Sequence, residues 1–250
     1  MAVGSRIGQV ALVAATWPVA LLLVLGAPTS ALAQTTASDD PSPHSEATLV
    51  SEQTSISPGE SFTVALRLTM EDGWHSYWKN PGASGEPTSI DWTLPDGFEA
   101  GSIQWPYPHK IPFGSLVSYG YSDEVFLLVD ITPPETLTLG TTVTLGGKAR
   151  WLICEEICLP AHSEIELSLP VTDGPPEATE WAEAFDQARS RQPTTVASWS
   201  VGAGRSDGDY QLLLNASGDV RSDLEGAYFY SSEKSVIDPG APQPVTQNGG

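Results

Sequence analysis

The 250-residue sequence contains very few cysteines, histidines and basic residues. It has two cysteines and four histidines, and its 11 lysines and arginines stand against 31 aspartates and glutamates, for a formal net charge of −20. So acidic a chain repels phosphates, which argues against binding to nucleic acid. No nucleophile, histidine and acid arrangement can be recognised among four histidines, which argues against a hydrolase. The acidic residues are scattered, as on a solvated surface.

Long apolar runs are also missing after the first 33 residues. No later window approaches the roughly 20 apolar residues that a membrane-spanning helix needs. Residues 1–33 carry one cation, Arg6, then a long apolar stretch and the small-residue exit Ala31-Leu32-Ala33. This pattern predicts a secretory signal peptide cleaved after Ala33, with a membrane anchor as the alternative. We therefore expect an exported protein in an extracytoplasmic space, with a polar linker over 34–46.

Residues 47–172 have the pattern of a β domain. Apolar and polar residues alternate over 62–70, 125–131 and 165–169, which is the period of a half-buried strand. Turn signals such as Ser57-Pro58-Gly59 separate these runs. Short strands with frequent turns and no helical period favour an all-β, immunoglobulin-like antiparallel β-sandwich. The Cys-Trp-Cys spacing of immunoglobulin cores is absent.

A smaller region follows the Pro/Gly-rich boundary at 173–176. Residues 177–191 have a helix-forming composition with apolar residues near one face. The segments 198–201, 210–214 and 227–230 look like strands. About 75 residues with so few strands bury little core. We expect 177–250 to be a second, partial α+β or β domain, which is incomplete here or completes its core on a partner.

The two cysteines, Cys154 and Cys158, flank the acidic tripeptide 155–157. In an oxidising compartment they are expected to form a disulfide at least part of the time. Four positions along a strand span about 13 Å, which a disulfide cannot bridge. The segment must therefore fold back, either as a hairpin with a three-residue loop or as one helical turn limited by Pro160. Either geometry places the sulfurs at a loop tip, where a partner thiolate can reach them.

Three interpretations of this pair compete. A structural disulfide is the default in an exported protein, but closing so short a loop contributes the least stability. Cys154, Cys158 and His162 have a C-x3-C-x3-H spacing that suits zinc or copper, without an evident fourth ligand. A redox-active dithiol is favoured because a short loop makes the bond labile. Glu155 and Glu156 are expected to raise the thiol pKa, so that the disulfide is attacked by a more reactive thiolate.

An aromatic motif and the cysteine segment together carry a resemblance to a known family. The residues concerned are Gly73-Trp74-His75-Ser76-Tyr77-Trp78-Lys79-Asn80-Pro81-Gly82-Ala83-Ser84-Gly85, Trp105-Pro106, Gly120-Tyr121 and 154–160. Over about 47–170 the chain resembles the N-terminal periplasmic domain of the DsbD thiol:disulfide interchange family. It is most similar to the ScsB-like branch, which is associated with copper tolerance. A weaker similarity to that branch continues over 227–243.

The resemblance implies a function and a set of partners. The Cys154–Cys158 pair would take electrons from a thioredoxin-like donor domain and pass them to periplasmic disulfide-containing proteins, as part of a protein-disulfide reductase of the kind that serves cytochrome c biogenesis. No cofactor is implied. A membrane electron-transfer domain is implied in the same or another chain, since no Cys-x-x-Cys motif is present here. The alternative is a module that binds copper, zinc or a protein and has a structural disulfide.

The resemblance also implies a cap that shields the disulfide. The matching segment is 109–114, with Phe113 as the shielding ring and His109 and Tyr77 as further members of the site. Ile111 and Pro112 stand where the better-studied branch has acidic cap residues. An apolar cap would exclude small oxidants until a docking protein displaced it.

The residues near the pair have alternative interpretations. Tyr77, Trp78 and Trp105 are expected mainly in the sandwich core. His75 and His109 could assist proton transfer, but they are expected at the surface. Cys154 ends a predicted strand and should be more buried than Cys158.

Overall fold

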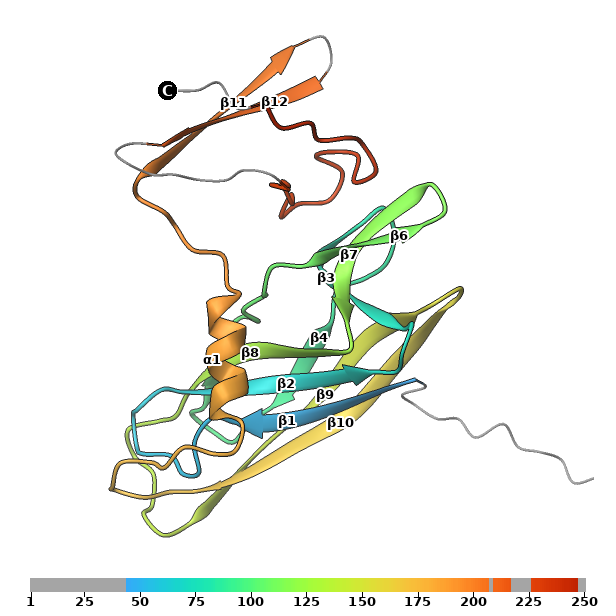
Figure 1. The fold of residues 1–250 in the computed structure, drawn as a ribbon. Coiled ribbons are helices and arrows are strands. Elements are labelled where there is room, and N and C mark those ends of the chain that lie inside the picture. Colours follow the sequence, from blue (N-terminus) through green and yellow to red (C-terminus); the bar gives the residue numbers. More distant parts are fainter. Residues whose placement is uncertain (1–43, 207–208, 217–225, 247–250) are drawn as a thin grey trace, which may run out of the picture. The chain divides into compact units, whose positions relative to one another are not determined.

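The computed structural model describes residues 44–206, 209–216 and 226–246 (Figure 1). The expected signal peptide and residues 34–43 of the expected linker lie outside the described residues. Within the described part of the chain, no helix is long and apolar enough to cross a membrane.

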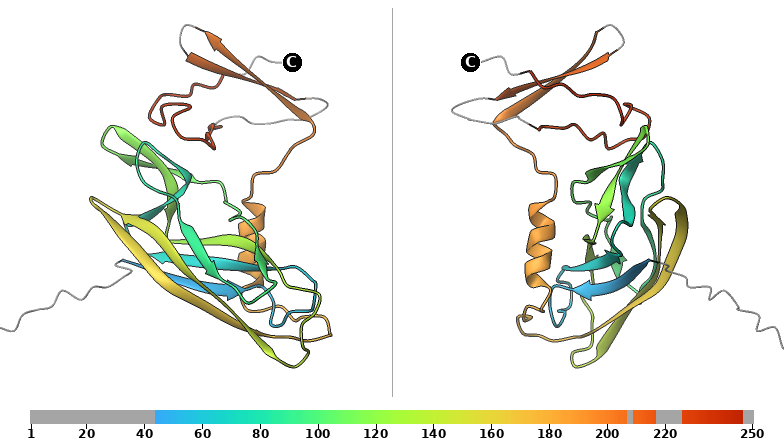
Figure 2. Two further views of the ribbon diagram at one scale, coloured as in Figure 1. Left: turned by 180° about the vertical axis from the view of Figure 1, so that it is seen from behind. Right: turned by 45° about the vertical axis from the view of Figure 1, so that its right-hand side comes forward.

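Two antiparallel sheets form the main body of the protein (Figures 1 and 2). The first sheet has the spatial order β1 (Ser45–Ser51), β2 (Phe62–Met70), β8 (Glu124–Thr132) and β5 (Glu99–Ala100). The second has the order β10 (Cys158–Pro170), β9 (Thr142–Cys154), β3 (His75–Gly82), β7 (Leu116–Ser122) and β6 (His109–Phe113), and β4 (Ser89–Thr93) also pairs with β9. The expected strands at 62–70, 125–131 and 165–169 all lie within these elements.

One hydrophobic core joins the two sheets. Val64, Leu66 and Leu68 alternate along β2 and pack in the same cluster as Trp151 and Ile153 of β9. Side chains that alternate inward and outward are what a sandwich requires of its strands. The expected all-β, immunoglobulin-like sandwich is therefore confirmed.

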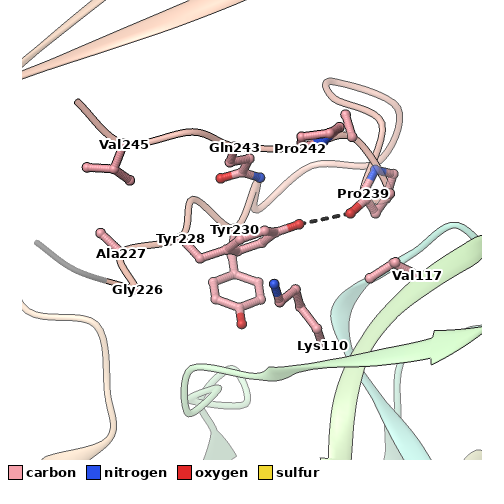
Figure 3. Close-up of a pocket in the computed structure, with 12 residues that line it drawn as sticks. Lys110, Val117, Gly226, Ala227, Tyr228, Tyr230, Pro239, Pro242, Gln243 and Val245 are labelled. Atoms are coloured by element: carbon pink, nitrogen blue, oxygen red, sulfur yellow. Dashed lines mark hydrogen bonds between the residues drawn. The ribbon is translucent and has the colours of Figure 1, made fainter.

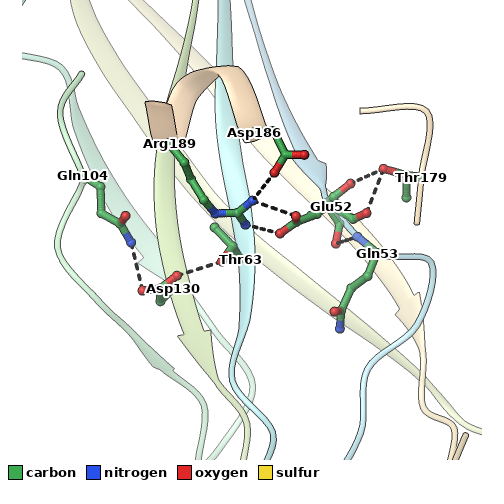
Figure 4. Close-up of polar contacts among 9 residues, drawn as sticks. Glu52, Gln53, Thr63, Gln104, Asp130, Thr179, Asp186 and Arg189 are labelled. Atoms are coloured by element: carbon green, nitrogen blue, oxygen red, sulfur yellow. Dashed lines mark hydrogen bonds and ion pairs between the residues drawn. The ribbon is translucent and has the colours of Figure 1, made fainter. Parts of the chain in front are cut away.

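The helix α1 (Ala182–Ser190) is shorter than the expected helical segment and lies against the first sheet. Phe185 is fully buried among Val50, Ala65 and Phe126. Polar contacts anchor the last turn of the helix, because the Arg189 guanidinium binds Glu52 at 2.8 Å through Nη1 and also contacts the carboxylate through Nη2 (Figure 4). Both apolar burial and ion pairing thus hold α1 on the sandwich.

The C-terminal part contains a two-stranded hairpin, β11 (Trp199–Ser206) and β12 (Asp209–Ala216). The strand expected at 227–230 is wrong, because those residues form no ladder. Their tyrosines pack instead. Tyr228 Oη lies 3.1 Å from Tyr119 Oη, and it donates to the Pro239 carbonyl at 2.9 Å (Figure 3). Aromatic packing, rather than sheet pairing, holds this segment.

Candidate dithiol site

The two cysteines lie at the tip of the long β9–β10 hairpin. They are direct cross-strand partners, with Cα atoms 4.2 Å apart, and they form a disulfide. The Glu155 amide donates to the Ile157 carbonyl at 3.1 Å and closes the three-residue loop. The hairpin is thus the correct geometry of the two that the spacing allowed. Cys154 is 1% exposed and Cys158 is exposed, so the expected difference in burial is confirmed.

Strand alternation places Cys154, His75 and Tyr77 on the face of the second sheet that points away from the core. Trp151 and Ile153 of β9 belong to the core, so Cys154, which follows them, points to the other face. Trp74, just before β3, and Trp78 of β3 belong to the core, and the residues between them alternate in the same way. His75 is the cross-strand partner of Cys154. The sequence pattern gives the face of each residue, but the pairing of β3 with β9 that brings His75 beside Cys154 is a tertiary contact.

Tyr77 contacts both sulfurs. Its hydroxyl donates to Cys154 Sγ at 3.0 Å and lies 3.4 Å from Cys158 Sγ. Desolvation by burial raises the pKa of the Tyr77 hydroxyl, while a hydrogen bond from Ser84 opposes that effect. The hydroxyl therefore stays protonated at neutral pH and acts as a donor. Tyr77 is buried at this site and does not belong to the sandwich core, whereas Trp78 is in the core and Trp105 packs against it.

Two glycines of the aromatic motif fit closely around the site. A Cβ on Gly85, whose φ is +108°, would lie 2.4 Å from the Tyr77 ring, so the glycine lets the loop pass over that ring. A Cβ on Gly73, whose φ is +86°, would lie 2.9 Å from the Glu155 carboxylate. The sequence alone indicates no role for either glycine. Their roles depend on contacts with Tyr77 and Glu155 that only the fold creates.

One of the two histidines departs from the surface position expected for both. His75 is only 8% exposed, so that expectation is wrong for this residue: it lies between β7 and β9 in the sheet. His109 is exposed, and its Nε2 lies 3.2 Å from Ser122 Oγ. Burial lowers the pKa of His75, with a further contribution from the charge of His109. Burial and the Arg191 charge lower the pKa of His109, against the opposing effect of Asp123.

The segment expected to cap the disulfide is a β-hairpin. His109 pairs with Gly120, which pairs with Tyr77, so the base of the β6–β7 hairpin borders the site. Phe113 lies four residues further, about 13 Å along the strand. It pairs with Leu116 at the hairpin tip and is 55% exposed. In this structure the aromatic residue that contacts the sulfurs is Tyr77, through its hydroxyl, and shielding by Phe113 stays a prediction.

The geometry does not support the metal site suggested by the cysteine and histidine spacing. In β10, His162 lies opposite Arg150, four extended residues from Cys158. That separation of about 13 Å is too large for one ion to bind both side chains. Among the residues that the structure describes, no three His, Cys, Asp or Glu side chains are placed to hold a metal ion.

One cavity in the described part of the chain is separate from the disulfide. It has a volume of about 590 Å³ and lies between β6, β7 and the 226–246 segment (Figure 3). The Lys110 ammonium lies 4.3 Å from the centre of the Tyr228 ring at its wall. Neither cysteine lines this cavity.

The fold and the site together define an antiparallel β-sandwich domain with a disulfide at a hairpin tip, one sulfur buried and the other exposed. The family model described as thiol:disulfide interchange protein DsbD, N-terminal, matches residues 45–170. The chain therefore belongs to the family of DsbD N-terminal domains, as the sequence resemblance indicated.

Comparison with solved structures finds the N-terminal periplasmic domain of ScsB from Proteus mirabilis. The similarity has a TM-score of 0.48 and 20% sequence identity, and it covers 69% of this chain and 62% of that chain. The chain thus spans less than two thirds of that structure. A search of curated proteins finds no match.

Proposed function

We propose that this chain is a periplasmic thiol:disulfide interchange domain of the ScsB-like branch, with Cys154 and Cys158 as its redox-active pair. One observation carries the proposal: the exposed Cys158 is bonded to the buried Cys154. Such a disulfide presents one sulfur to an incoming thiolate and keeps the leaving sulfur inside the protein. Membership of the DsbD N-terminal family supports the same chemistry.

The exchange begins at Cys158. A partner thiolate attacks Cys158 Sγ, the Cys154–Cys158 bond breaks, and its electron pair leaves with Cys154 as a thiolate. The hydrogen bond from Tyr77 Oη, 3.0 Å away in the disulfide form, is directed at that sulfur. The second thiol of the partner then attacks the mixed disulfide and releases Cys158 as a thiolate. Two electrons have moved, the partner holds a new disulfide, and the chain holds two thiols once protons are taken up.

The surroundings of Cys158 favour a protein as the reductant. The loop beside it carries the exposed carboxylates Glu155 and Glu156 and the apolar Ile157, which is 62% exposed. The carboxylates repel small anionic thiols such as glutathione, while the apolar side chain offers a protein surface to pack on. We propose a thioredoxin-like domain as electron donor and exported disulfide-containing proteins as acceptors. A membrane electron-transfer domain in the same or another chain, copper tolerance and cytochrome c biogenesis are the context that this role would have.

Trapping a mixed disulfide tests this function. The variants C154S and C158S each keep one cysteine. Each is mixed with a thioredoxin-like protein that has a single active-site cysteine carrying a thionitrobenzoate leaving group. We expect C154S to react at least about tenfold faster than C158S, because only Cys158 is exposed. We also expect C154S to react faster with this protein than with the same leaving group on glutathione.

The trapped product is identified by peptide mapping. A covalent adduct at Cys158 supports the proposed order of attack. The proposal is overturned if neither variant forms an adduct with the thioredoxin-like protein, or if C158S reacts as fast as C154S.

A further inference from the structure

His75 is unusual among the ionisable residues of the described chain. The aspartates, glutamates, lysines and arginines of the described chain are all at least partly exposed. His75 is buried, and the other buried ionisable residues there are tyrosines and Cys154. Burial of an imidazole costs free energy unless its nitrogens find partners. His75 lies directly opposite Cys154 across the β3–β9 pair, so this cost arises beside the disulfide. Directly opposite residues of antiparallel strands have Cβ atoms about 4.5–5.5 Å apart.

The imidazole of His75 packs against an aromatic ring of its own strand. Its contact with Tyr77 is an edge-to-face packing of the rings, with centroids 5.5 Å apart. A buried polar ring usually needs a hydrogen-bond partner. Cys154, directly opposite, can donate to it in one redox state only, because in the disulfide it has no proton to donate. Reduction converts it to a thiol, which can donate to an imidazole nitrogen.

The groups around His75 keep the imidazole neutral, and a neutral imidazole can accept a proton. It faces Tyr77 on its own strand, His109 on β6 and Cys154 on β9, while Ser122, its partner on β7, is uncharged. Burial and the His109 charge lower the pKa of His75, so the ring is neutral at neutral pH. The Glu155 carboxylate lies over Gly73, two residues before His75 in the chain.

We propose that His75 accepts the proton of the Cys154 thiol when the reduced pair passes its electrons on. This inference rests on the proposed exchange function. Cys158 of the reduced chain attacks the disulfide of an acceptor protein, and a mixed disulfide forms. His75 takes the proton from the Cys154 thiol, and the thiolate attacks Cys158 Sγ. The Cys154–Cys158 bond forms, the acceptor thiolate leaves, and the proton on His75 passes to that thiolate or to solvent.

The pH profile of the Cys154 thiol tests this role. In the C158S background, the thiolate of Cys154 is followed by its ultraviolet absorbance from acid to alkaline pH, with and without H75Q. Glutamine keeps a polar side chain but cannot take up a proton. We expect H75Q to lower the thiolate fraction near pH 7 by about tenfold and to remove the low-pH step of the curve. H109Q is the matched control, and it should keep both steps.

A second measurement uses the unaltered chain. The imidazole signals of His75 and His109 are titrated by NMR in the disulfide form and in the reduced form. We expect the titration of His75 to move by about one pH unit or more on reduction, because its neighbour becomes a thiol. The titration of His109 should move less.

The inference is overturned if His75 titrates identically in both redox states, or if H75Q and its parent give the same thiolate curve. Neither measurement needs a redox partner. If the trapping experiment fails while the thiol and imidazole titrations give the expected results, the proposed function is contradicted and the coupling of His75 to Cys154 is not.

Discussion

At the residue scale, the hydroxyl of Tyr77 is the polar group in closest contact with the sulfurs. It donates to Cys154 Sγ at 3.0 Å, and burial raises the pKa of the hydroxyl so that it remains a donor. Cys154 is the sulfur that leaves as a thiolate when Cys158 is attacked. A hydrogen bond to an anion is about twice as strong as one to a neutral acceptor. The contact should therefore favour the reaction more than it favours the resting disulfide.

The first prediction concerns this hydroxyl. We expect Y77F to slow reduction of the disulfide by dithiothreitol by about tenfold, which corresponds to about 1.4 kcal/mol and is close to the value of a hydrogen bond to a charged group. Stopped-flow measurement of the reduction rate checks it. Y107F, which removes the hydroxyl of an exposed tyrosine, should leave the rate unchanged. Equal rates for Y77F and the parent would show that the hydroxyl has no such role.

The second prediction is a pH dependence of stability caused by His75. Its pKa in the folded protein is lowered by burial, below the ordinary value of 6.5. Between the two pKa values, His75 is therefore protonated in the unfolded chain and neutral in the folded chain. Stability should fall as the pH drops below about 6.5, with a slope from this one group of at most about 1.4 kcal/mol per pH unit, until the folded pKa is passed.

Urea denaturation of the parent and H75Q at several pH values measures this effect. The difference in unfolding free energy between the two proteins should change across that acid window and be constant above it. A difference that is independent of pH would contradict the burial of a neutral His75.

At the element scale, the site depends on the register of three strands. Gly120 of β7 lies between Tyr77 on β3 and His109 on β6. A Cβ at this position would lie 1.9 Å from the Ser76 carbonyl oxygen and 3.0 Å from Ile111 Cδ1. Backbone blocks the space on one side, so the strands can approach this closely only if residue 120 has no side chain.

The third prediction follows from that close approach. We expect G120A to lower the free energy of unfolding by more than about 2 kcal/mol, because β3 and β7 must separate to admit the methyl group. Displacement of β3 should also change the reduction rate of the disulfide. Chemical denaturation and the dithiothreitol assay check both effects. G204A is the matched control in a strand with open space around it, and it should change stability by less than about 0.5 kcal/mol. If G120A behaved like G204A, the proposed strand packing would be wrong.

The sequence predicted correctly those elements that depend on local patterns. The alternation over 62–70 coincides with β2, and the four-residue cysteine spacing required the fold-back that the β9–β10 hairpin provides. Within the expected cap segment 109–114, residues 109–113 form a strand because β7 pairs with them over their whole length. That pairing is a tertiary contact. The strand tolerates Pro112 because β6 lies at the edge of the sheet.

The site was predicted less completely than the fold. The cysteines stand out in the sequence because they are the two that the chain has. The buried position of His75 and the contact of Tyr77 with the sulfurs depend on which strands become neighbours. Periodicity gives the faces of each strand, but it does not give the order of strands in a sheet.

At the scale of the whole molecule, α1 links the sandwich to the C-terminal part of the chain. The second, partial domain expected over 177–250 stays a prediction. The helix that opens this stretch buries Phe185 against β8 and β2 of the first sheet. It also carries Arg189, which pairs with Glu52 (Figure 4). We infer that the helix unfolds together with the sandwich.

The fourth prediction tests that cooperativity. We expect F185A to lower the free energy of unfolding of the sandwich by about 3–5 kcal/mol, the usual cost of removing a buried phenylalanine ring. The disulfide should keep its reduction rate, since α1 lies on the other sheet. Thermal and urea unfolding, followed by tryptophan fluorescence and circular dichroism, measure the change. F229A, at a more exposed phenylalanine, should cost far less. A separate early transition of the helix, with the sandwich unchanged, would instead support an independent domain from 177.

If Cys154 and Cys158 exchange electrons with other proteins, the reduction potential of the pair must lie within reach of those proteins. The chain is equilibrated with thiol–disulfide buffers of known potential, and the reduced fraction is counted by alkylation and mass spectrometry. We predict a potential above about −300 mV, in the range where thioredoxin-like proteins can reduce the pair. A potential far below about −300 mV, as in inert structural disulfides, would contradict the account.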